Sequence, residues 1–439
     1  MSQLEDSDRM HISARQDERL RSLLREVGSD NAFVRQQLER AGLTVSDCQN
    51  LSFNQLLNRL PFTTKRDLVT DQAAHPPYGS NLTFERSKYS RLHQTSGTTT
   101  GVPLRWLDTP QSWQWVMDCW AQLFRIAGLS EDDRLFFPFS FGPFLGFWAG
   151  FESASRLGHF CVAGGGMTSS ARLRMLFDNE FTVVCCTPTY ALRLAETAIA
   201  EGLDLAASSV RTLLVAGEPG GSIGSIRQRL EASWGARVID HWGMTELGPL
   251  AIECAANPGG QHVLETECVA EIIDSQTGLA SEPDADGVRR GELVVTSLGR
   301  IGSPLIRYRT GDLVLSSSAV CPCGRDLLRL DGGILGRADD MLIIRGNNVF
   351  PSSIEAILRE FDEVVEYRLE VRDERSMTHL RIQIEPISNL SEAALSSLLS
   401  RITSAIKDRL NFMADLQLVP SDSLPRFELK GRRVVRISE

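Results

Sequence analysis

A polar, glycine-containing stretch at residues 93–106, HQTSGTTTGVPLRW, has the residue types of a phosphate-binding loop. Backbone N–H groups next to glycine can approach an anion closely, and the hydroxyls of Ser96, Thr98 and Thr99 can donate to phosphate oxygens or ligate Mg²⁺. The stretch fails the Walker pattern, because Gly101 is followed by Val102 and not by Lys-Ser/Thr. Taken alone, it is as compatible with an ordinary Ser/Thr/Gly turn as with a phosphate loop.

A second group of residues has the donor atoms of a metal site. Cys321 and Cys323 form a Cys-x-Cys pair in a turn, and Cys254 precedes His262 with seven residues between them. Two short clusters that together supply four nitrogen and sulfur ligands fit a closed, tetrahedral structural Zn²⁺ site. Cys268 could replace His262 in that set. Cysteine pairs without a metal are also common, so both interpretations stay open.

Composition narrows the class of partner. The chain has 439 residues, a formal net charge of −10 and no Lys/Arg-rich run. This balance argues against nucleic acid or an anionic membrane surface, and we expect a small-molecule substrate. The first residues are charged and lack the apolar segment of a leader, so we expect a cytoplasmic protein. The apolar run at 135–151 is shorter than a membrane span and is interrupted by Pro and Gly, which indicates a buried wall.

The elements that must position these residues follow from periodicity. Residues 13–60 have helical spacing of apolar positions. From about 90 to 240, strand-like runs such as RLFFPF, FTVVCCTP and VRTLLVAGE alternate with helical patterns, which predicts βαβ units and a largely parallel sheet. After residue 250 the runs VAEIID, GELVVTSL and LIRYRTGDLVL predict an antiparallel β lobe.

We therefore predict an α/β protein. It has a large N-terminal domain with mainly parallel sheets flanked by helices plus a β lobe, and a small mobile α+β C-terminal domain. The predicted divisions are an N-terminal helical layer of the large domain at 1–90, the core with its β lobe at 91–335, and the small domain at 336–439.

Five further segments decide how the loop is interpreted: VAGEPGGS (215–222), DHWGMTE (240–246), SPLIRYRTGDL (303–313), GRADDMLIIRGNNVFPSSIE (336–355) and LPRFELKGRR (424–433). Together with the loop, and in this order, they resemble the adenylate-forming acyl and aryl ligase superfamily, and more narrowly the phenylacetate-CoA ligase family. The resemblance runs from about residue 90 to the C-terminus. It implies a two-step reaction in which ATP and a carboxylic acid give an acyl-adenylate, and coenzyme A then displaces AMP.

The resemblance also implies residue roles. The loop residues Ser96, Gly97, Thr98, Thr99 and Gly101 would close over the β- and γ-phosphates, with Thr99 and Glu246 holding Mg²⁺. Asp312 would accept hydrogen bonds from the ribose hydroxyls. Three residues near the reaction centre would be catalytic: Lys430, Glu246 and Arg337, the last of which would also lie near the ribose and phosphate. Asp339 would be the hinge of the small domain. The remaining nucleotide-binding residues would be Ala216, Gly217, Glu218, Pro219, Asp240, His241, Trp242, Gly243, Met244 and Thr245.

One departure from the family pattern concerns the loop. The family usually has Ser-Gly-Thr-Thr-Gly-Lys-Pro, whereas here Thr100 is inserted and Val102 stands in place of lysine. Either Arg105 compensates, or pyrophosphate is held less tightly.

The acid pocket is expected at Phe141, Gly165, Gly166 and Tyr190, because glycines and aromatic residues together make a flat slot that suits an aryl group. Plain core packing is the other interpretation of these aromatic residues.

The leading function is an aryl- or arylacetyl-CoA ligase, and the resemblance suggests a homodimer. The alternative is an adenylating enzyme that passes its acyl or AMP group to a carrier protein, an amine or another non-CoA acceptor. An inactive nucleotide-binding protein is disfavoured because Glu246, Asp312, Arg337 and Lys430 are all retained.

Overall fold

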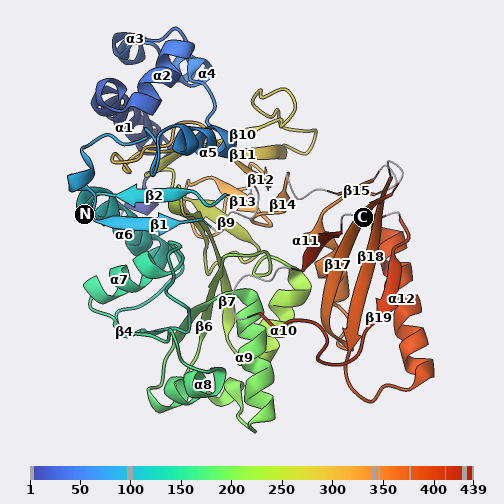
Figure 1. Ribbon diagram of the computed structural model, residues 1–439. Coiled ribbons are helices and arrows are strands. Elements are labelled where there is room, and N and C mark those ends of the chain that lie inside the picture. The colour runs from blue at the N-terminus through green and yellow to red at the C-terminus, as the bar shows by residue number, and fades with distance from the viewer. Residues whose placement is uncertain are drawn as a thin grey trace.

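The computed structural model describes residues 4–95, 102–338, 342–344, 347–374, 377–410, 412–427 and 433–437. An eight-stranded sheet forms the centre of the large part of the molecule, with the order β13-β9-β8-β7-β6-β5-β3-β4 (Figure 1). Its parallel section consists of β3 (Arg134–Phe137), β4 (Phe160–Ala163), β5 (Val183–Cys186), β6 (Thr212–Ala216) and β7 (Arg237–Met244). This section confirms the predicted parallel sheet.

Helices cover both faces of this sheet because successive strand residues point to opposite sides. Leu135 and Phe137 of β3 belong to a core shared with α6 (Pro110–Ile126) and α7 (Trp148–Arg156). Phe136, between them, belongs to a second core shared with the helices on the other face, α8 (Ser169–Asp178), α9 (Pro188–Ala200) and α10 (Gly224–Trp234). The apolar run at 135–151 therefore supplies buried wall, as predicted.

The sheet continues with antiparallel strands that the sequence pattern does not separate from the β lobe. β8 (Gly248–Glu253) pairs with β7, β9 (Gly260–Val263) pairs with β8, and β13 (Arg329–Asp331) pairs with β9. Only three residues join β7 to β8, which is too short for the crossover that a parallel pair needs. Residues 248–263 therefore extend the large sheet instead of opening the β lobe.

The β lobe is a second sheet with the order β10-β11-β12-β14, and its neighbouring strands are antiparallel. It consists of β10 (Cys268–Ile273), β11 (Arg289–Ser297), β12 (Tyr308–Ser316) and β14 (Gly336–Arg337). The N-terminal helices pack on it, since Leu20, Val27 and Leu38 share a core with Val269 and Ile306. These helices are α1 (Arg9–Asp30), α2 (Ala32–Arg40), α3 (Val45–Asn50), α4 (Phe53–Arg59) and α5 (Lys65–Ala74).

The stretch at 93–106 lies in a hairpin. Its strands are β1 (Arg91–Gln94) and β2 (Arg105–Asp108), which pair antiparallel. Hydrogen bonds continue the ladder past the strand ends, because the backbone N–H of Thr95 donates to the Leu104 carbonyl over 2.9 Å.

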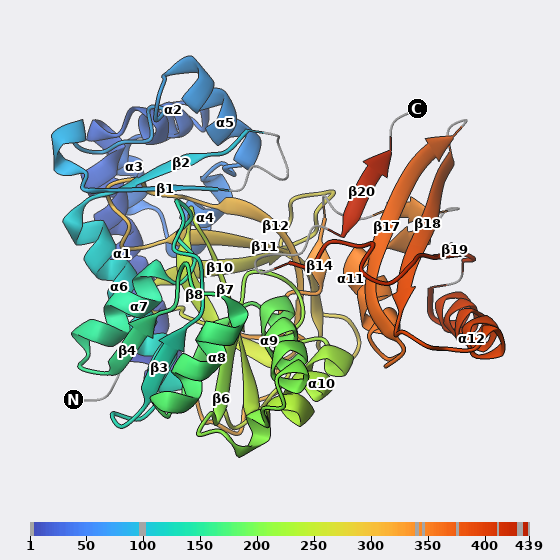
Figure 2. The ribbon, with the colours of Figure 1, turned by 60° about the horizontal axis from the view of Figure 1, so that its bottom comes forward.

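The C-terminal part, residues 342–437, lies to one side of the large part (Figures 1 and 2). It has its own buried core, which includes Ile354, Leu369, Ile382 and Ile402. Its main sheet has the order β19-β18-β17-β20, and α11 and α12 pack with it. The elements are β15 (Leu342–Ile344), β16 (Asn347–Val349), α11 (Pro351–Leu358), β17 (Val364–Glu374), β18 (Met377–Pro386), α12 (Glu392–Leu410), β19 (Asp415–Leu418) and β20 (Val434–Ile437).

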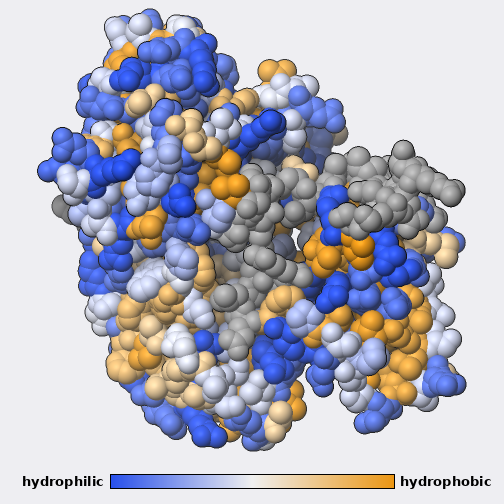
Figure 3. All heavy atoms as spheres, in the orientation of Figure 1, coloured by the Kyte–Doolittle hydropathy of each residue, from blue (hydrophilic) through white to orange (hydrophobic). Residues whose placement is uncertain are grey.

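The surface is predominantly hydrophilic over the N-terminal helices, at the top of Figure 3. The same view shows the surface hollowed between the C-terminal part and the lower side of the large part. None of the helices in the described ranges combines the length and the apolar character that a bilayer-spanning segment requires.

A buried carboxylate lies between the large sheet and the segment after β6. Asp240 of β7 accepts hydrogen bonds on Oδ2 from Ser222 Oγ (2.5 Å) and Gln261 Nε2 (2.8 Å). Burial raises the pKa of Asp240 to about 7; the nearby Glu253 carboxylate adds to this effect, whereas the Ser222 hydrogen bond opposes it. The folded protein therefore binds a proton at Asp240 more tightly than the unfolded chain does.

This pKa gives a pH-dependent stability. For a carboxyl with a raised pKa, the stability present at low pH is lost as pH rises from about 4 to about 7 and is then constant. The amide introduced by Asp240→Asn stays neutral at every pH, so this variant should gain stability relative to the native protein between pH 5.5 and pH 8, on the order of 2 kcal/mol. Melting temperatures of both proteins at the two pH values measure this gain.

The exposed Asp274, whose pKa is lowered by hydrogen bonds from Thr277, provides the control. Asp274→Asn should show the same offset from the native protein at both pH values. An equal offset at pH 5.5 and pH 8 for Asp240→Asn as well would show that Asp240 titrates in its ordinary range.

Candidate functional site

The predicted nucleotide segments gather at the carboxyl ends of β5, β6 and β7, the edge at which parallel sheets bind ligands. Ala216 ends β6, and Gly217 follows with φ of +95°, a conformation that favours glycine. Glu218 Oε1 accepts a hydrogen bond from the backbone N–H of Thr189 over 2.8 Å, in the first turn of α9. The segment that includes Pro219 is thereby fixed to the N-terminal end of that helix.

Asp312 lies where the β-lobe sheet contacts the large sheet. Its Oδ2 accepts a hydrogen bond from Trp242 Nε1 of β7 over 2.8 Å, and its Oδ1 accepts one from the guanidinium of Arg337 over 3.0 Å. Asp312 and Arg337 are also paired in the register of β12 and β14. Arg337 donates in addition to the Thr310 carbonyl (3.3 Å). The structure therefore brings together three residues that the sequence predicted from three separate segments.

Glu246 is buried in the turn after β7. Its Oε1 accepts a hydrogen bond from the Tyr308 hydroxyl over 2.9 Å, and Lys65 Nζ of α5 lies 3.8 Å from the same oxygen. Burial raises the pKa of Tyr308 well above its usual value, and the Glu246 carboxylate adds to that rise, so Tyr308 stays a hydrogen-bond donor. The arrangement presents a buried carboxylate next to the hairpin that contains the predicted phosphate loop.

A buried ion pair holds that turn to the hairpin. Arg300 donates to both carboxylate oxygens of Asp108, at the end of β2, over 2.7 and 2.6 Å. A third donation, over 2.6 Å, reaches the carbonyl of Thr245. Both side chains of the pair are fully buried. The position of Glu246 is therefore coupled to the strand that follows the loop.

Several predicted residues lie outside the described ranges. These are the loop residues Ser96, Gly97, Thr98, Thr99 and Gly101, the hinge Asp339 and the lysine Lys430. Of the flanking residues, Arg105 donates through its guanidinium to the Pro77 carbonyl over 3.0 Å.

The other predicted nucleotide residues of β7 are packing elements as well. His241 Nδ1 lies 2.8 Å from the Ala251 carbonyl, and its ring centroid lies 4.5 Å from that of Trp120. Burial lowers the pKa of His241 to about 4, so the imidazole is neutral at pH 7. A Cβ at Gly243 would lie 2.7 Å from the Gly248 carbonyl oxygen, so only glycine fits there. Met244 closes the strand.

The residues predicted for the acid pocket have two different environments. Phe141 is part of a group of edge-to-face aromatic rings, with its centroid 4.7 Å from that of Trp148. A Cβ at Gly165 would lie 3.6 Å from the Phe141 ring, so this glycine backs the aromatic wall; Gly166 follows with φ of +77°. Tyr190, in contrast, is a residue of α9 that is only 1% exposed in the core. Its hydroxyl accepts a hydrogen bond from the guanidinium of Arg172 in α8.

The predicted metal ligands form one cluster. The donor atoms of Cys254, His262, Cys321 and Cys323 all lie within 4.8 Å of one another. Cys323 Sγ is 3.3 Å from His262 Nε2, and His262 Nδ1 is 3.4 Å from the Leu327 carbonyl. A proton on Nδ1 would leave the lone pair of Nε2 facing the cysteines. The alternative ligand, Cys268, donates instead to the Leu264 carbonyl and is not part of the cluster.

Sequence reasoning missed several residues of this site. Tyr308 had a usable signal, because it precedes Asp312 by four positions on one strand and so shares its face. Lys65, Asp108 and Arg300 had none, since each reaches the site through contacts distant in sequence.

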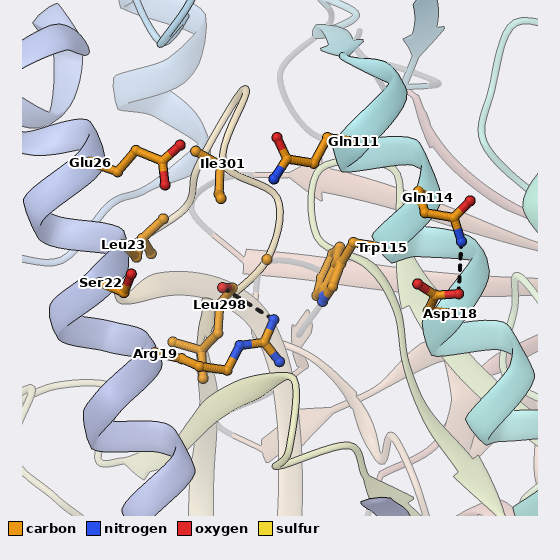
Figure 4. A pocket seen from close by; sticks show the side chains of 11 residues that line it. Arg19, Ser22, Leu23, Glu26, Gln111, Gln114, Trp115, Asp118, Leu298 and Ile301 are labelled. Carbon is orange, nitrogen blue, oxygen red and sulfur yellow. Dashed lines mark hydrogen bonds between the residues drawn. The ribbon is translucent and has the colours of Figure 1, made fainter.

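A separate cavity of about 330 Å³ lies between α1 and α6 (Figure 4). Its lining includes Arg19, Glu26, Gln111, Trp115 and Gly299. Of the predicted site residues that the structure describes, none lines this cavity.

Comparison with known proteins agrees with this geometry. Residues 16–299 match the AMP-binding enzyme family, and residues 346–436 match the AMP-binding enzyme C-terminal domain. Phenylacetate-coenzyme A ligase of Thermus thermophilus is 32% identical, over 99% of this chain and 98% of its own length. The Escherichia coli enzyme of the same name is 30% identical, over 96% and 94% respectively.

A solved structure adds information on conformation. 2-Hydroxyisobutyryl-CoA ligase in the postadenylation state with 2-HIB-AMP has a TM-score of 0.91 at 28% identity, covering 99% of this chain and 91% of its own. The same enzyme in the thioesterification state, with 2-HIB-AMP and CoA, has a TM-score of 0.73 at 29% identity and the same coverage. The overall structure of this chain is thus more similar to the former state than to the latter. By these matches, the chain belongs to the AMP-binding enzymes and, among them, to the phenylacetate-CoA ligase family of AMP-forming acid–thiol ligases.

Proposed function

We propose that this protein is an ATP-dependent ligase that joins an aryl or arylacetic acid to coenzyme A through an acyl-adenylate. The observation that carries the proposal is the convergence of Asp312, Trp242 and Arg337 beside the buried Glu246. Asp312 is a carboxylate with two fixed donors that would accept hydrogen bonds from a nucleotide ribose, and Glu246 is a second buried carboxylate in a turn that Arg300 holds to Asp108 of the hairpin.

The proposed chemistry has two steps. An oxygen of the substrate carboxylate forms a bond to the α-phosphorus of ATP, and pyrophosphate leaves. The thiol sulfur of coenzyme A then attacks the acyl carbon, and AMP leaves with the electron pair of the C–O bond. Asp312 would orient the ribose, and the guanidinium of Arg337 would lie next to it, because the ion pair between them fixes both groups.

Magnesium fits the residues present. Glu246 is a buried carboxylate, the kind of oxygen ligand that a hard cation takes, and Thr99 outside the described ranges would be its partner. A bound Mg²⁺ would neutralise charge on the phosphate oxygens. Tyr308 and Lys65 would hold Glu246 in place.

The preference for an aryl acid is supported by the aromatic wall. Phe141, Trp148 and Phe151 meet edge to face next to Gly165, and together they would form a flat apolar surface. The names of the two similar phenylacetate-CoA ligases point to the same class of acid. The predicted homodimer and the cytoplasmic location stay predictions.

The test of the proposed function is carried out in two stages. ATP–pyrophosphate exchange is measured across aromatic, arylacetic and short aliphatic acids, and coenzyme A is then added and the thioester followed. We expect exchange to be fastest with an aryl or arylacetic acid and the thioester to form. Exchange without a thioester would favour transfer to a carrier protein, an amine or another acceptor, and no exchange with any acid would contradict the proposal.

A variant of Asp312 tests whether this activity depends on the described contacts of its carboxylate. Asp312→Asn removes the charge that Arg337 and Trp242 orient, so the KM for ATP should rise about 10- to 100-fold, the range for loss of hydrogen bonds to a charged group. Glu271→Gln is the matched control, because Glu271 pairs with Arg307 at the opposite edge of the same sheet. An unchanged KM in Asp312→Asn would remove Asp312 from nucleotide binding.

We further propose that Cys254, His262, Cys321 and Cys323 bind one structural Zn²⁺. One pair of ligands comes from the β8–β9 region and the other from the turn before β13, and they converge within the spacing of a tetrahedral set. A bound ion would tie that turn to the edge of the large sheet.

Metal analysis tests this site. The native protein should contain one zinc per chain after purification without chelator, and Cys321→Ser/Cys323→Ser should lose it together with thermal stability. Cys268→Ser is the control, since Cys268 lies outside the cluster, and it should keep the zinc. A folded native protein without zinc would overturn the assignment.

A further inference from the structure

One arginine of the C-terminal part reaches into the large part. Arg433, which directly precedes β20, is 7% exposed and donates to both carboxylate oxygens of Glu366, over 2.7 and 3.0 Å. Its third nitrogen donates to the hydroxyl of Thr189 over 3.2 Å. The guanidinium is therefore fixed by its own part of the molecule, and one donor is directed across the boundary.

Thr189 connects this contact to the nucleotide segment. It lies in the first turn of α9, and its backbone N–H donates to Glu218 over 2.8 Å. Glu218 belongs to the segment 215–222 that follows β6. Thr189 thus contacts the C-terminal part through its hydroxyl and the predicted nucleotide-binding segment 215–222 through its backbone N–H.

Other hydrogen bonds in the described ranges also cross the boundary, among them the one from Ser352 Oγ to the Leu335 carbonyl over 3.1 Å. Ser225 of α10 donates to the Ala356 carbonyl of α11 over 3.0 Å. On the same surface Arg229 faces Arg359: burial lowers the pKa of Arg229, and the charge of Arg359 lowers it further. The carboxylates of Glu196 and Asp362 act in the opposite direction on the pKa of Arg229.

We propose that the hydrogen bond from Arg433 to Thr189 is the latch that holds the C-terminal part in the arrangement for adenylation. Lys430, the predicted catalytic lysine, lies outside the described residues and precedes Arg433 by only three positions, so the latch and this lysine belong to one segment of the chain. The greater overall similarity to the postadenylation state of 2-hydroxyisobutyryl-CoA ligase than to its thioesterification state agrees with this role. The inference rests on the proposed function.

The acceptor is a neutral hydroxyl, and this matters for the second step. A hydrogen bond to a hydroxyl is weaker than an ion pair with a carboxylate in a buried position. The contact can then break when the C-terminal part changes its arrangement for thioester formation. Thr189 and Arg433 are positioning residues in this scheme, because they act through Lys430.

The test separates the two half-reactions. Thr189→Val keeps the shape of the side chain but removes the acceptor, so ATP–pyrophosphate exchange should fall about 10-fold. Thioester formation from a preformed acyl-adenylate and coenzyme A should stay within about twofold of native, since it does not need the latched arrangement. Thr189→Ser, which keeps the hydroxyl, should restore exchange.

Thr197→Val is the matched control. Thr197 lies on the same helix and its hydroxyl donates within that helix, to the Arg193 carbonyl, so neither half-reaction should change. An equal loss of both half-reactions in Thr189→Val, or no loss in either, would overturn the latch.

Hydrogen–deuterium exchange without substrates gives a readout that does not depend on activity. Peptides that contain residues 351–358 and 433–437 should exchange faster in Thr189→Val than in the native protein and in Thr197→Val. Unchanged exchange in these peptides would overturn the latch even if the native enzyme is active. Failure of the proposed function would appear separately, as absence of pyrophosphate exchange in the native enzyme with every acid.

Discussion

The carboxylate of Asp312 is the point on which the arrangement of the site depends. It is held on one side by the indole N–H of Trp242, from the large sheet, and on the other by Arg337, from the last strand of the β lobe. The two sheets therefore meet through one charged group that accepts a hydrogen bond on each oxygen. Hydrogen bonds to a charged group contribute about 1.5–3 kcal/mol each, so removal of the carboxylate would weaken the contact between the sheets. The same two contacts therefore fix both the relative position of the sheets and the geometry of the site.

The pair of Arg300 and Asp108 has the corresponding role on the phosphate side. Both groups are fully buried, and loss of one partner from a buried pair costs about 3–5 kcal/mol because the other charge stays without compensation. Since Arg300 also donates to the Thr245 carbonyl, the pair fixes the turn that carries Glu246 relative to the hairpin. Tyr308 completes this support from the same strand face as Asp312. A buried ion pair and a buried hydrogen bond in this way hold residues that are far apart in the sequence at one site.

The sequence predicts some elements and residues of this structure and not others. The strands β3 to β7 were predicted because their apolar runs alternate with helical patterns, a local signal that tertiary contacts reinforce. The clustering of Cys254, His262, Cys321 and Cys323 was also predicted, from donor types in two short groups. In contrast, the antiparallel strands β8 and β9 are fully buried, as the parallel strand β5 is, and the short connection after Met244 decides the direction of β8. Lys65, Asp108 and Thr189 could not be found, because an isolated lysine, aspartate or threonine has no periodicity that indicates its distant partner.

The two ends of the C-terminal part are attached with unequal strength, and this inequality suits an enzyme that performs two steps. At the near end, Arg337 is bound by a charge-assisted bond to the fixed Asp312, a few residues before the C-terminal part begins. At the far end, Arg433 meets the large part through a neutral hydroxyl, and the neighbouring surface places Arg229 against Arg359. A change of arrangement would therefore break the weak contact first and keep the strong one, so that the C-terminal part turns about its beginning. Asp339, the predicted hinge, follows Arg337 by two positions and lies outside the described residues. Under the proposed function, the strong ion pair would preserve the nucleotide site through both steps, and the weak hydrogen bond would allow the predicted catalytic lysine to leave before the thiol of the second step arrives.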